Sequence, residues 1–445
     1  METLDSFKTV EEAVSEFGEL RDIVAEATRP YVNNRPVIKY KCNECSSGIA
    51  LKLWEVLLLG VITCNDCLLT GKTGTGKTRL AKLALNGLFG GDGFVNKTIT
   101  PAMEPSDFLD INYGDVHSGK KSLKEALEAA KPLHVPALIL NEPNRAPAMI
   151  QSYLIPLLDM EMDIEGKSFP VGKEVPGIGR QYQFRVLTIN EGDAYLVTDM
   201  DKALRDRAVL TLALDAFYQG ADDCHIMLEY MEQDPEATGF RAAETSYLER
   251  IIKLWSFLPK IKVSDEARRM LIYLSGMSYC AELEQDGIYP PLKELLDFTE
   301  SYCRKRECRY AATTDLNPVG NLCGAVQAPS QRSLRHLLSS ARGLVLARLA
   351  IEKDTPCQVM VEDLWAIAPL VLYRKLGLSY EWKNQSAGSE WIALNKALNA
   401  VRKRRESLPD KFRTKPLKEL DQNELRKYAE EKIDCWVMRF ADVQP

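Results

Sequence analysis

One eight-residue segment constrains the fold of this chain more than any other. Residues 71–78 read GKTGTGKT and match the pattern G-x-x-x-x-G-K-[ST] at every position. A short apolar run, Cys67–Leu69, precedes the segment, and an amphipathic stretch that begins at Arg79 follows it. Glycines let backbone N–H groups approach phosphate oxygens closely, and a following helix N-terminus adds partial positive charge. The pattern therefore predicts a buried strand, a phosphate-binding loop and a helix, in that order.

The side chains at the end of this loop predict how a nucleoside triphosphate would be bound. We expect Lys77 to reach the β- and γ-phosphates and the Thr78 hydroxyl to ligate Mg²⁺. Because Lys77 would contact the phosphate that is transferred, it is also a candidate catalytic residue. The other predicted nucleotide contacts come from the loop and its flank: Gly71, Lys72, Thr73, Gly74, Thr75, Gly76 and Arg79.

The region around the loop predicts an α/β domain, with a mainly parallel sheet flanked by helices. Apolar segments alternate with helical patterns from residue 42 to about residue 214, as expected for a parallel sheet covered on both faces. A Glu-Gly turn within residues 162–171 also predicts a hairpin. The predicted strands are Cys67–Leu69, Val95–Thr100, Val135–Leu140, Phe184–Ile189 and Val209–Leu214.

Helical patterns on both sides of this region divide the chain into four predicted parts. A capping box of Thr9 and Glu12 opens a predicted helix over Val10–Ala27. After residue 216 the pattern is amphipathic and helical almost throughout, including a predicted helix over residues 292–304. The predicted parts are an N-terminal helical segment (1–40), a nucleotide-binding core (41–215), an enlarged helical domain with inserted helices (216–375) and a helical C-terminal extension (376–445).

Charge and composition limit the classes of function that fit this chain. Its 445 residues carry a formal net charge of −6, which argues against a dominant basic face for duplex DNA. We expect the cluster Arg402–Arg405 to be a solvated helix face, with a nucleic-acid contact as the minority interpretation. The longest apolar run is too short to cross a bilayer, and the N-terminus does not read as a signal peptide. We therefore expect a cytoplasmic protein without membrane contact.

The cysteines allow two interpretations. Four of the eleven form two pairs with two residues between the members, Cys42 with Cys45 and Cys64 with Cys67. This spacing is typical of a four-thiolate zinc site. The stretch Ile49–Val61 reads as one helix, however, and at about 1.5 Å per residue it would separate the pairs by roughly 20 Å. Either this helix is shorter than its pattern indicates and zinc is bound, or the four residues are buried free thiols.

A second nucleotide-site motif lies at Leu138–Glu142, one strand beyond the phosphate loop. Such a strand end normally supplies an aspartate to the Mg²⁺ shell and then a glutamate that orients and activates the attacking water. Glu142 is present, but Asn141 stands at the aspartate position. The amide oxygen can still accept a hydrogen bond from a Mg²⁺-bound water. A unit charge about 4 Å away is worth about 4 kcal/mol at an effective dielectric of 20, so we expect slow hydrolysis rather than none.

These motifs together resemble a known family. The residues NEPNRAP at 141–147, the helix pattern over Gln151–Met160 and the hairpin pattern after it are similar to the MoxR family of AAA+ ATPases, in the helix-2-insert group. The resemblance implies an AAA+ P-loop core with an enlarged helical lid. It covers about residues 45–215 well and 260–375 loosely. The helices at 216–300 and the tail after residue 375 are not explained by it.

The resemblance assigns roles to two residues outside the phosphate loop. Asn190, directly after the strand Phe184–Ile189, would be the sensor-1 residue that helps Glu142 to hold the hydrolytic water. Arg332 would be the sensor-2 residue, which contacts the γ-phosphate from the lid. The alternative interpretations are a capping role for Asn190 and an exposed position at a helix N-terminus for Arg332.

An arginine finger is also implied, in the segment ALRDR at 203–207. Arg207 is the first candidate and Arg205 the second, although Ala208 replaces the phenylalanine that the family has there. Such a finger completes the site of a neighbouring subunit. An intramolecular ion pair with Asp206 or Asp201 is the alternative for either arginine.

The resemblance finally implies what the whole chain does. It predicts a homo-oligomeric ring of the family's hexameric type that binds and hydrolyses ATP with Mg²⁺ and remodels or assembles a protein partner. Partners with a von Willebrand A domain are common in the family. Two alternatives remain. Asn141 favours an ATP-gated scaffold with negligible turnover, and a nucleic-acid-linked NTPase of the McrB type would need the basic cluster at 402–405 to contact DNA.

Overall fold

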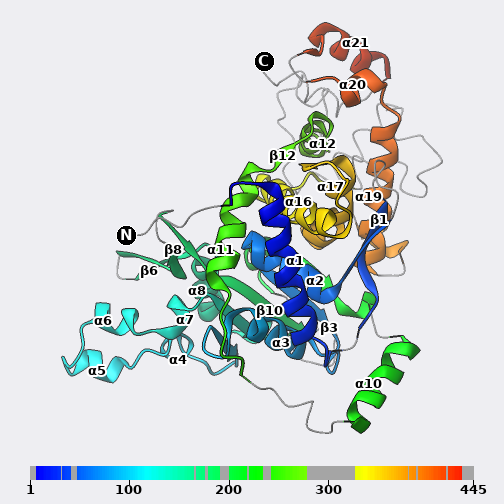
Figure 1. Ribbon diagram of the computed structural model, residues 1–445. Helices are drawn as coiled ribbons and strands as arrows, with labels where there is room; N and C mark the ends of the chain where they lie inside the picture. The colour runs from blue at the N-terminus through cyan, green and yellow to red at the C-terminus, as the bar shows by residue number, and fades with distance from the viewer. Residues whose placement is uncertain are drawn as a thin grey trace. The chain divides into compact units, whose positions relative to one another are not determined.

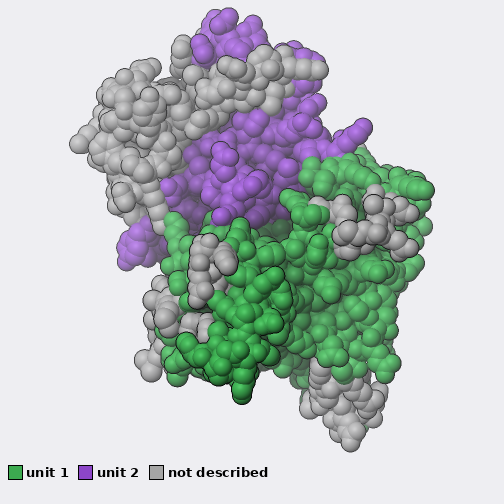
Figure 2. Space-filling view, turned by 90° about the vertical axis from the view of Figure 1, so that its left-hand side faces the viewer, with its two compact units in different colours: residues 1–261, 342–357 green, residues 262–341, 358–445 purple. Residues whose placement is uncertain are grey.

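A computed structural model of the chain (Figure 1) describes residues 7–31, 33–41, 48–164, 167–175, 179–190, 200–217, 220–233, 242–277, 326–378, 380–386, 389–416 and 419–432. The chain divides into two compact units, one formed by residues 1–261 and 342–357 and the other by residues 262–341 and 358–445 (Figure 2). The division into four parts expected from the sequence stays a prediction.

A parallel sheet of five strands forms the centre of the first unit. The strands lie in the order β11-β3-β10-β5-β4, and all four neighbouring pairs are parallel. Four of the strands are buried along almost their whole length, as expected when helices cover both faces. The predicted strands are confirmed, with the bounds β3 (Cys67–Gly71), β4 (Phe94–Thr98), β5 (Ala137–Asn141), β10 (Phe184–Asn190) and β11 (Leu210–Ala213).

Side chains that alternate along a strand face different helices. Leu68 and Leu187 belong to a core cluster with Leu154 of α8 (Ala148–Leu158). Cys67, the residue before Leu68 in β3, faces α2 (Leu53–Thr63) instead. Its Sγ lies so close to Gly60 of that helix that a Cβ added there would be 2.7 Å away. The sheet is therefore covered on both faces.

The N-terminal helix forms as predicted, as α1 (Val10–Ala27). Thr9 Oγ1 accepts from Glu12 N at 3.2 Å, and Glu12 Oε2 accepts from Thr9 N at 3.4 Å, so the predicted capping box is present. The buried side chains Phe17 and Leu20 lie on the face of α1 that packs against α2 and α3 (Lys77–Phe89).

The single helix predicted over Ile49–Val61 is wrong at its start. β1 (Pro36–Lys41) and β2 (Gly48–Lys52) form an antiparallel hairpin, and α2 begins directly after it. Buried and exposed side chains alternate along β2, which is the strand period rather than the helix period. Glu55 Oε2 accepts from Lys52 N at 2.8 Å and fixes the helix start.

Two further hairpins lie between α8 and β10. The predicted one is confirmed as β6 (Glu161–Ile164) with β7 (Lys167–Pro170), and a second, β8 (Lys173–Val175) with β9 (Arg180–Tyr182), follows it. Short helices precede β5 and share a core cluster with α8. They are α4 (Pro105–Leu109), α5 (Tyr113–His117), α6 (Leu123–Glu128) and α7 (Lys131–His134).

After β11 the described structure is helical except for one short parallel pair, β12 (Lys262–Val263) with β13 (Gln358–Val359). The predicted helix over residues 292–304 lies outside the described residues. No helix in the described part of the chain combines the length and the apolar composition that a bilayer span requires. The helical elements are η3 (Leu214–Phe217), α10 (Ala221–Gln233), α11 (Leu248–Phe257), η4 (Leu258–Lys260), α12 (Asp265–Ser275), α16 (Gln331–Ile351), α17 (Val361–Leu372), α18 (Tyr380–Asn384), α19 (Glu390–Glu406), α20 (Asp410–Thr414) and α21 (Gln422–Lys432).

Candidate nucleotide-binding site

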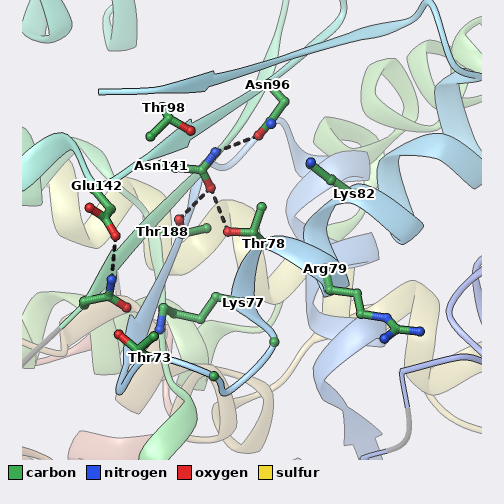
Figure 3. Close-up of a pocket in the computed structure, with 13 residues that line it drawn as sticks. Thr73, Lys77, Thr78, Arg79, Lys82, Asn96, Thr98, Asn141, Glu142 and Thr188 are labelled. Atoms are coloured by element: carbon green, nitrogen blue, oxygen red, sulfur yellow. Dashed lines mark hydrogen bonds between the residues drawn. The ribbon is translucent and has the colours of Figure 1, made fainter. Parts of the chain in front are cut away.

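The carboxyl ends of β3, β5 and β10 meet at one edge of the sheet. In the register of the strands, Asn190 pairs with Gly71 and Thr188 pairs with Asn141. A pocket of about 490 Å³ lies at this edge (Figure 3), within the usual size of a small-molecule site. Its lining residues are Thr73, Gly74, Gly76, Lys77, Thr78, Arg79, Lys82, Asn96, Thr98, Asn141, Glu142, Thr188 and Asn190.

The phosphate loop is held at both ends by residues distant in the sequence. Gly76 is the N-cap of α3 with a φ of 78°, and a Cβ there would lie 2.7 Å from Cε2 of Tyr31. The Tyr31 hydroxyl donates to the carbonyl oxygen of Thr75 at 3.3 Å, and burial raises the pKa of Tyr31 to about 12. At the start of the loop, Lys72 N donates to Asp215 Oδ1 at 3.1 Å. Glycine is therefore required at Gly76 both by its backbone conformation and by the close tyrosine ring.

Lys77 is buried within the curve of the loop. Its Nζ donates to the carbonyl oxygens of Gly71 at 2.8 Å and Lys72 at 2.7 Å, and to Thr75 Oγ1 at 3.3 Å. A lysine ammonium has three donor hydrogens, so the loop satisfies all of them. Phosphate oxygens are anionic and attract the ammonium more strongly than neutral carbonyl oxygens do, so they would compete well for these donors.

Asn141, at the end of β5, is the centre of a hydrogen-bond network (Figure 3). Its Oδ1 accepts from the hydroxyls of Thr78 at 2.8 Å and Thr188 at 2.9 Å. Its Nδ2 donates to Asn96 Oδ1 at 2.7 Å and to the carbonyl oxygen of Lys97 at 3.3 Å. The two donors and two lone pairs of the amide are therefore all used.

The Thr78 hydroxyl offers a neutral oxygen that fits a Mg²⁺ site, and Asn141 holds it in place by accepting its hydrogen. Mg²⁺ prefers oxygen ligands, and in nucleotide sites it keeps several waters and takes few ligands from the protein. Because the Thr78 hydroxyl donates its hydrogen to Asn141, its lone pairs stay available for a cation. Among the lining residues Glu142 is the only carboxylate, so Mg²⁺ would be bound less tightly than with aspartate at position 141.

Glu142 lies in a constrained turn directly after β5. Its φ of 57° is in the left-handed region, which is rare for a residue with a side chain, and its N–H donates to the carbonyl oxygen of Thr188 at 2.7 Å. Oε1 accepts from Asn190 Nδ2 at 2.6 Å, and Oε2 lies 2.6 Å from Arg145 Nε in an ion pair. The carboxylate is thus held at the pocket, where it can accept a proton from water. Arg145 follows within η1 (Pro143–Arg145).

The structure brings most of the predicted site residues into this pocket, but not all. The lining includes the predicted base, both predicted Mg²⁺ residues, the predicted sensor-1 residue and most of the loop. Arg332, the predicted sensor-2 residue, lies in the second unit at the start of α16. Within the first unit, the predicted site residues that do not line the pocket are Gly71, Lys72, Thr75, Arg205 and Arg207.

Arg207 makes an ion pair within its own chain. It ends α9 (Lys202–Arg207), and its Nε and Nη2 donate to Asp159 Oδ2 at 2.9 and 2.6 Å. The partner is therefore Asp159 at the C-terminus of α8, rather than Asp201 or Asp206. A role of Arg207 or Arg205 in a neighbouring subunit's site stays a prediction.

Four lining residues were missed by sequence reasoning: Lys82, Asn96, Thr98 and Thr188. Two signals could have found three of them. Asn96 and Thr98 are polar residues two apart within the predicted strand Val95–Thr100, so they share one face. Lys82 follows Thr78 by four residues on a helix and therefore lies on the same side of it.

The described residues do not support a zinc site. Cys42 and Cys45 lie outside the described residues. Cys64 Sγ donates to the carbonyl oxygen of Gln183 at 3.4 Å. Burial raises the pKa of Cys64 to about 12 and that of Cys67 well above its usual value, whereas zinc binds thiolates. Within the described ranges no group of three or more His, Cys, Asp or Glu side chains could hold a metal, and Cys67 fits a buried free thiol and Cys64 a half-buried one.

The basic cluster at residues 402–405 is only in part the solvated helix face that was expected, because Arg402 and Lys403 are exposed while the other two arginines are buried. Arg404 and Arg405 are only 7% and 4% exposed in α19, and Arg405 Nη2 pairs with Glu266 Oε1 at 2.8 Å. Arg402 Nε pairs with Glu406 Oε1 at 2.8 Å, on the same helix. Half of the cluster therefore serves packing within the second unit.

Comparisons with known proteins agree with this geometry. Residues 66–208 match the family described as AAA domain (dynein-related subfamily). The fold is similar to the crystal structure of a "putative ATPase" from Cytophaga hutchinsonii ATCC 33406, with a TM-score of 0.58 and 17% identity over 88% of this chain and 96% of that chain. None of the curated proteins matches this sequence. The parallel sheet flanked by helices is thus an AAA+ core, followed by a helical C-terminal part, and the predicted fold class is confirmed.

Proposed function

We propose that this protein is a cytoplasmic ATPase of the AAA+ type that binds ATP with Mg²⁺ and hydrolyses it slowly. The position of Glu142 carries the proposal, because its carboxylate is fixed by Asn190 and Arg145 beside the phosphate loop. A carboxylate that orients and activates water next to such a loop fits hydrolysis of a nucleoside triphosphate.

The lining residues divide the work of the reaction. Lys77 would exchange its loop carbonyl acceptors for oxygens of the β- and γ-phosphates. Thr78 would hold Mg²⁺, with its hydroxyl oriented by Asn141, and the bound ion would neutralise charge on the phosphates. Glu142 would accept the proton of the attacking water, while Asn190 and Arg145 keep the carboxylate in place.

We further propose that the working form is a homo-oligomeric ring, expected to be a hexamer, that remodels or assembles a protein partner. The support is the resemblance of the motifs to the MoxR family, which also suggests a partner with a von Willebrand A domain. In such a ring Arg207, or else Arg205, would complete the neighbouring site, and Arg332 would contact the γ-phosphate from the lid. Arg207 would first have to leave Asp159.

An ATP-gated scaffold is the second candidate, and Asn141 is the observation that favours it. An amide in place of a carboxylate removes an attraction of about 4 kcal/mol per unit of cation charge, at a separation of about 4 Å and an effective dielectric of 20. Binding of ATP could then drive assembly without useful turnover. A nucleic-acid-linked function has less support, since burial of Arg404 and Arg405 leaves little of the basic cluster to contact DNA.

ATP binding and steady-state phosphate release test the proposal. We expect Lys77→Ala to lose at least about tenfold in ATP affinity, because a charge-assisted contact to phosphate is removed. Glu142→Gln should keep ATP binding and lose about 10²- to 10⁴-fold in turnover, the usual contribution of a general base. Glu128→Gln, an exposed carboxylate on α6, is the matched control and should behave like the parent.

The outcomes separate the candidates. If the parent shows no Mg²⁺-dependent affinity for ATP, the proposed function is rejected. If the parent binds ATP but releases phosphate no faster than Glu142→Gln, the scaffold is the correct reading.

A further inference from the structure

We infer that Asn96 is a positioning residue of this site, which fixes the orientation of the Asn141 amide and through it the lone pairs of Thr78 that face Mg²⁺. The inference rests on the proposed function. It explains how the site can bind its cation although the usual aspartate is absent.

The position of Asn96 follows from the register of the sheet. β4 and β5 are parallel neighbours, with Thr98 opposite Asn141 and Asn96 opposite Ile139. The Asn96 side chain can therefore reach Asn141, and its Oδ1 accepts a hydrogen bond from Asn141 Nδ2 at 2.7 Å. Both asparagines line the pocket (Figure 3).

The orientation of the Asn141 amide is decided by what lies on each side of it. On one side stands the carbonyl oxygen of Lys97, 3.3 Å from Nδ2, and a carbonyl oxygen can only accept. The NH₂ group must therefore face Lys97 and Asn96. The amide oxygen is left for the hydroxyls of Thr78 and Thr188, which can donate to it.

A reversed amide would damage the cation site in two ways. The amide oxygen would face the carbonyl oxygen of Lys97, so two acceptors would stand against each other. The NH₂ group would face Thr78 and donate to its oxygen, which occupies a lone pair that a cation needs. The observed orientation instead takes the hydrogen of the Thr78 hydroxyl and leaves its lone pairs available.

Asn96 adds the stronger of the two bonds that hold this orientation. Its bond of 2.7 Å to Nδ2 is shorter than the 3.3 Å bond to Lys97. A typical hydrogen bond contributes about 1 kcal/mol net, which is about a fivefold change in an equilibrium constant. Removal of this acceptor should therefore weaken Mg²⁺ binding and leave the contacts of the phosphate loop unchanged.

The test compares ATP affinity with Mg²⁺ and in EDTA, by calorimetry, for the parent and three variants. Asn96→Leu has a similar size but no acceptor, and we expect the gain in affinity from Mg²⁺ to fall about fivefold, with the EDTA affinity unchanged. Asn96→Asp keeps an acceptor and should retain the gain. Thr100→Val, an exposed residue beyond β4 that does not line the pocket, is the control and should match the parent.

Three results would overturn the inference. They are an unchanged Mg²⁺ gain in Asn96→Leu, an equal loss with Mg²⁺ and in EDTA, and a loss in Asn96→Asp as large as that in Asn96→Leu. In each case the parent still binds ATP, so the proposed function survives. A parent that binds no ATP overturns both. If Asn96→Leu does not fold, Asn96→Ser, whose hydroxyl is too short to reach Asn141, provides the same comparison with the same expected loss.

Discussion

Single residues set the charge of the candidate pocket. Lys77, Arg79 and Lys82 are the cations among its lining residues, and Glu142 is the one carboxylate. That carboxylate is itself paired with Arg145 at 2.6 Å. The local charge is therefore positive before any metal is bound, and it attracts a polyanionic phosphate tail directly. Part of the affinity for a triphosphate should accordingly persist when Mg²⁺ is removed.

His336 gives a residue-scale prediction about stability. Burial, with Lys375, Arg332 and Arg335 nearby, lowers the pKa of His336 from 6.5 to about 3 in the folded chain. In the unfolded chain the imidazole takes up a proton near pH 6.5, so the unfolded state binds more protons between these values. Stability from this group is thus fully present above about pH 6.5 and is lost as the pH falls. We expect a loss of about 2 kcal/mol by pH 5.

Urea unfolding at pH 7 and pH 5 measures this effect. Replacement by His336→Gln removes the titrating group, so the variant should lose about 2 kcal/mol less than the parent over the same interval. Equal losses in parent and variant would show that His336 does not cause the pH dependence.

The residues of the site could be predicted from the sequence where their chemistry is local. The phosphate loop is a run of consecutive residues, and its glycines follow from local backbone geometry. The contact between Asn141 and Asn96 spans 45 residues and depends on which strand neighbours β5. The partner of Arg207 was also missed, because Asp159 lies 48 residues away on another helix. Such pairs are determined by tertiary packing, which periodicity does not show.

Among the elements, α8 is held at its C-terminus by two arginines from different parts of the core. Arg185 of β10 donates to the last carbonyl oxygens of α8 and, through Nε, to Asp66 Oδ1 at 3.0 Å. Arg207 of α9 pairs with Asp159, the C-cap of α8. The same helix end leads into the hairpin β6–β7. The position of this hairpin is therefore coupled to the sheet and to α9 through ion pairs.

Replacement of Arg185 tests the importance of this contact for the fold. The side chains of Arg185 and Asp66 are only 3% and 4% exposed. Arg185→Met would leave a buried carboxylate and the helix-end carbonyls without this partner. We expect a loss of about 3 kcal/mol in the free energy of unfolding, measured in urea. Arg402→Met removes an exposed helical ion pair and should cost less than about 1 kcal/mol, so similar losses would contradict the argument.

The type of most elements could be predicted, and the exceptions are segments whose sequence gives no clear periodic signal. The five sheet strands and α1 have clear period or capping signals in the sequence. The segment that becomes β2 and α2 is a continuous apolar stretch, in which strand and helix periods cannot be separated. The hairpin β8–β9 has strands of only three residues, too short for a periodic signal.

For the whole molecule, the central prediction concerns cooperation between copies of the chain. Arg207→Ala keeps its own base, and Glu142→Gln keeps its own arginine. If Arg207 acts on a neighbouring site, Arg207→Ala alone should lose at least about 10³-fold in turnover, and Glu142→Gln alone should lose about 10²- to 10⁴-fold. In a one-to-one mixture about a quarter of head-to-tail interfaces would join an intact base to an intact arginine, so about a quarter of the parent rate should return.

The control for this experiment is a mixture that cannot restore any site. Lys77→Ala and Glu142→Gln both disable the site of their own subunit, so their mixture should stay inactive. If the Arg207→Ala and Glu142→Gln proteins assemble together and no activity returns, Arg207 does not act on a neighbour.

The sequence was informative about the class of the whole molecule. Alternating strands and helices up to residue 214 predicted a parallel sheet covered on both faces, and the resemblance of the motifs to a known family implied the AAA+ core. In the two compact units, α1 is grouped with the core and α19 to α21 with the helical part. This grouping depends on contacts between distant segments, such as the bond from Arg269 Nε to the carbonyl oxygen of Arg413 at 2.6 Å.

The register of the sheet has a consequence for how this protein can diversify. Thr188 lies opposite Asn141 and Asn190 opposite Gly71, so the chemical groups at the strand ends keep their spacing through ladder hydrogen bonds alone. The hairpins β6–β7 and β8–β9 form separate two-stranded sheets and do not belong to that ladder. Mutations in the hairpin β6–β7 can therefore change its surface while the strand ends of the sheet keep their spacing. This separation makes the hairpin the natural place to graft a new binding sequence.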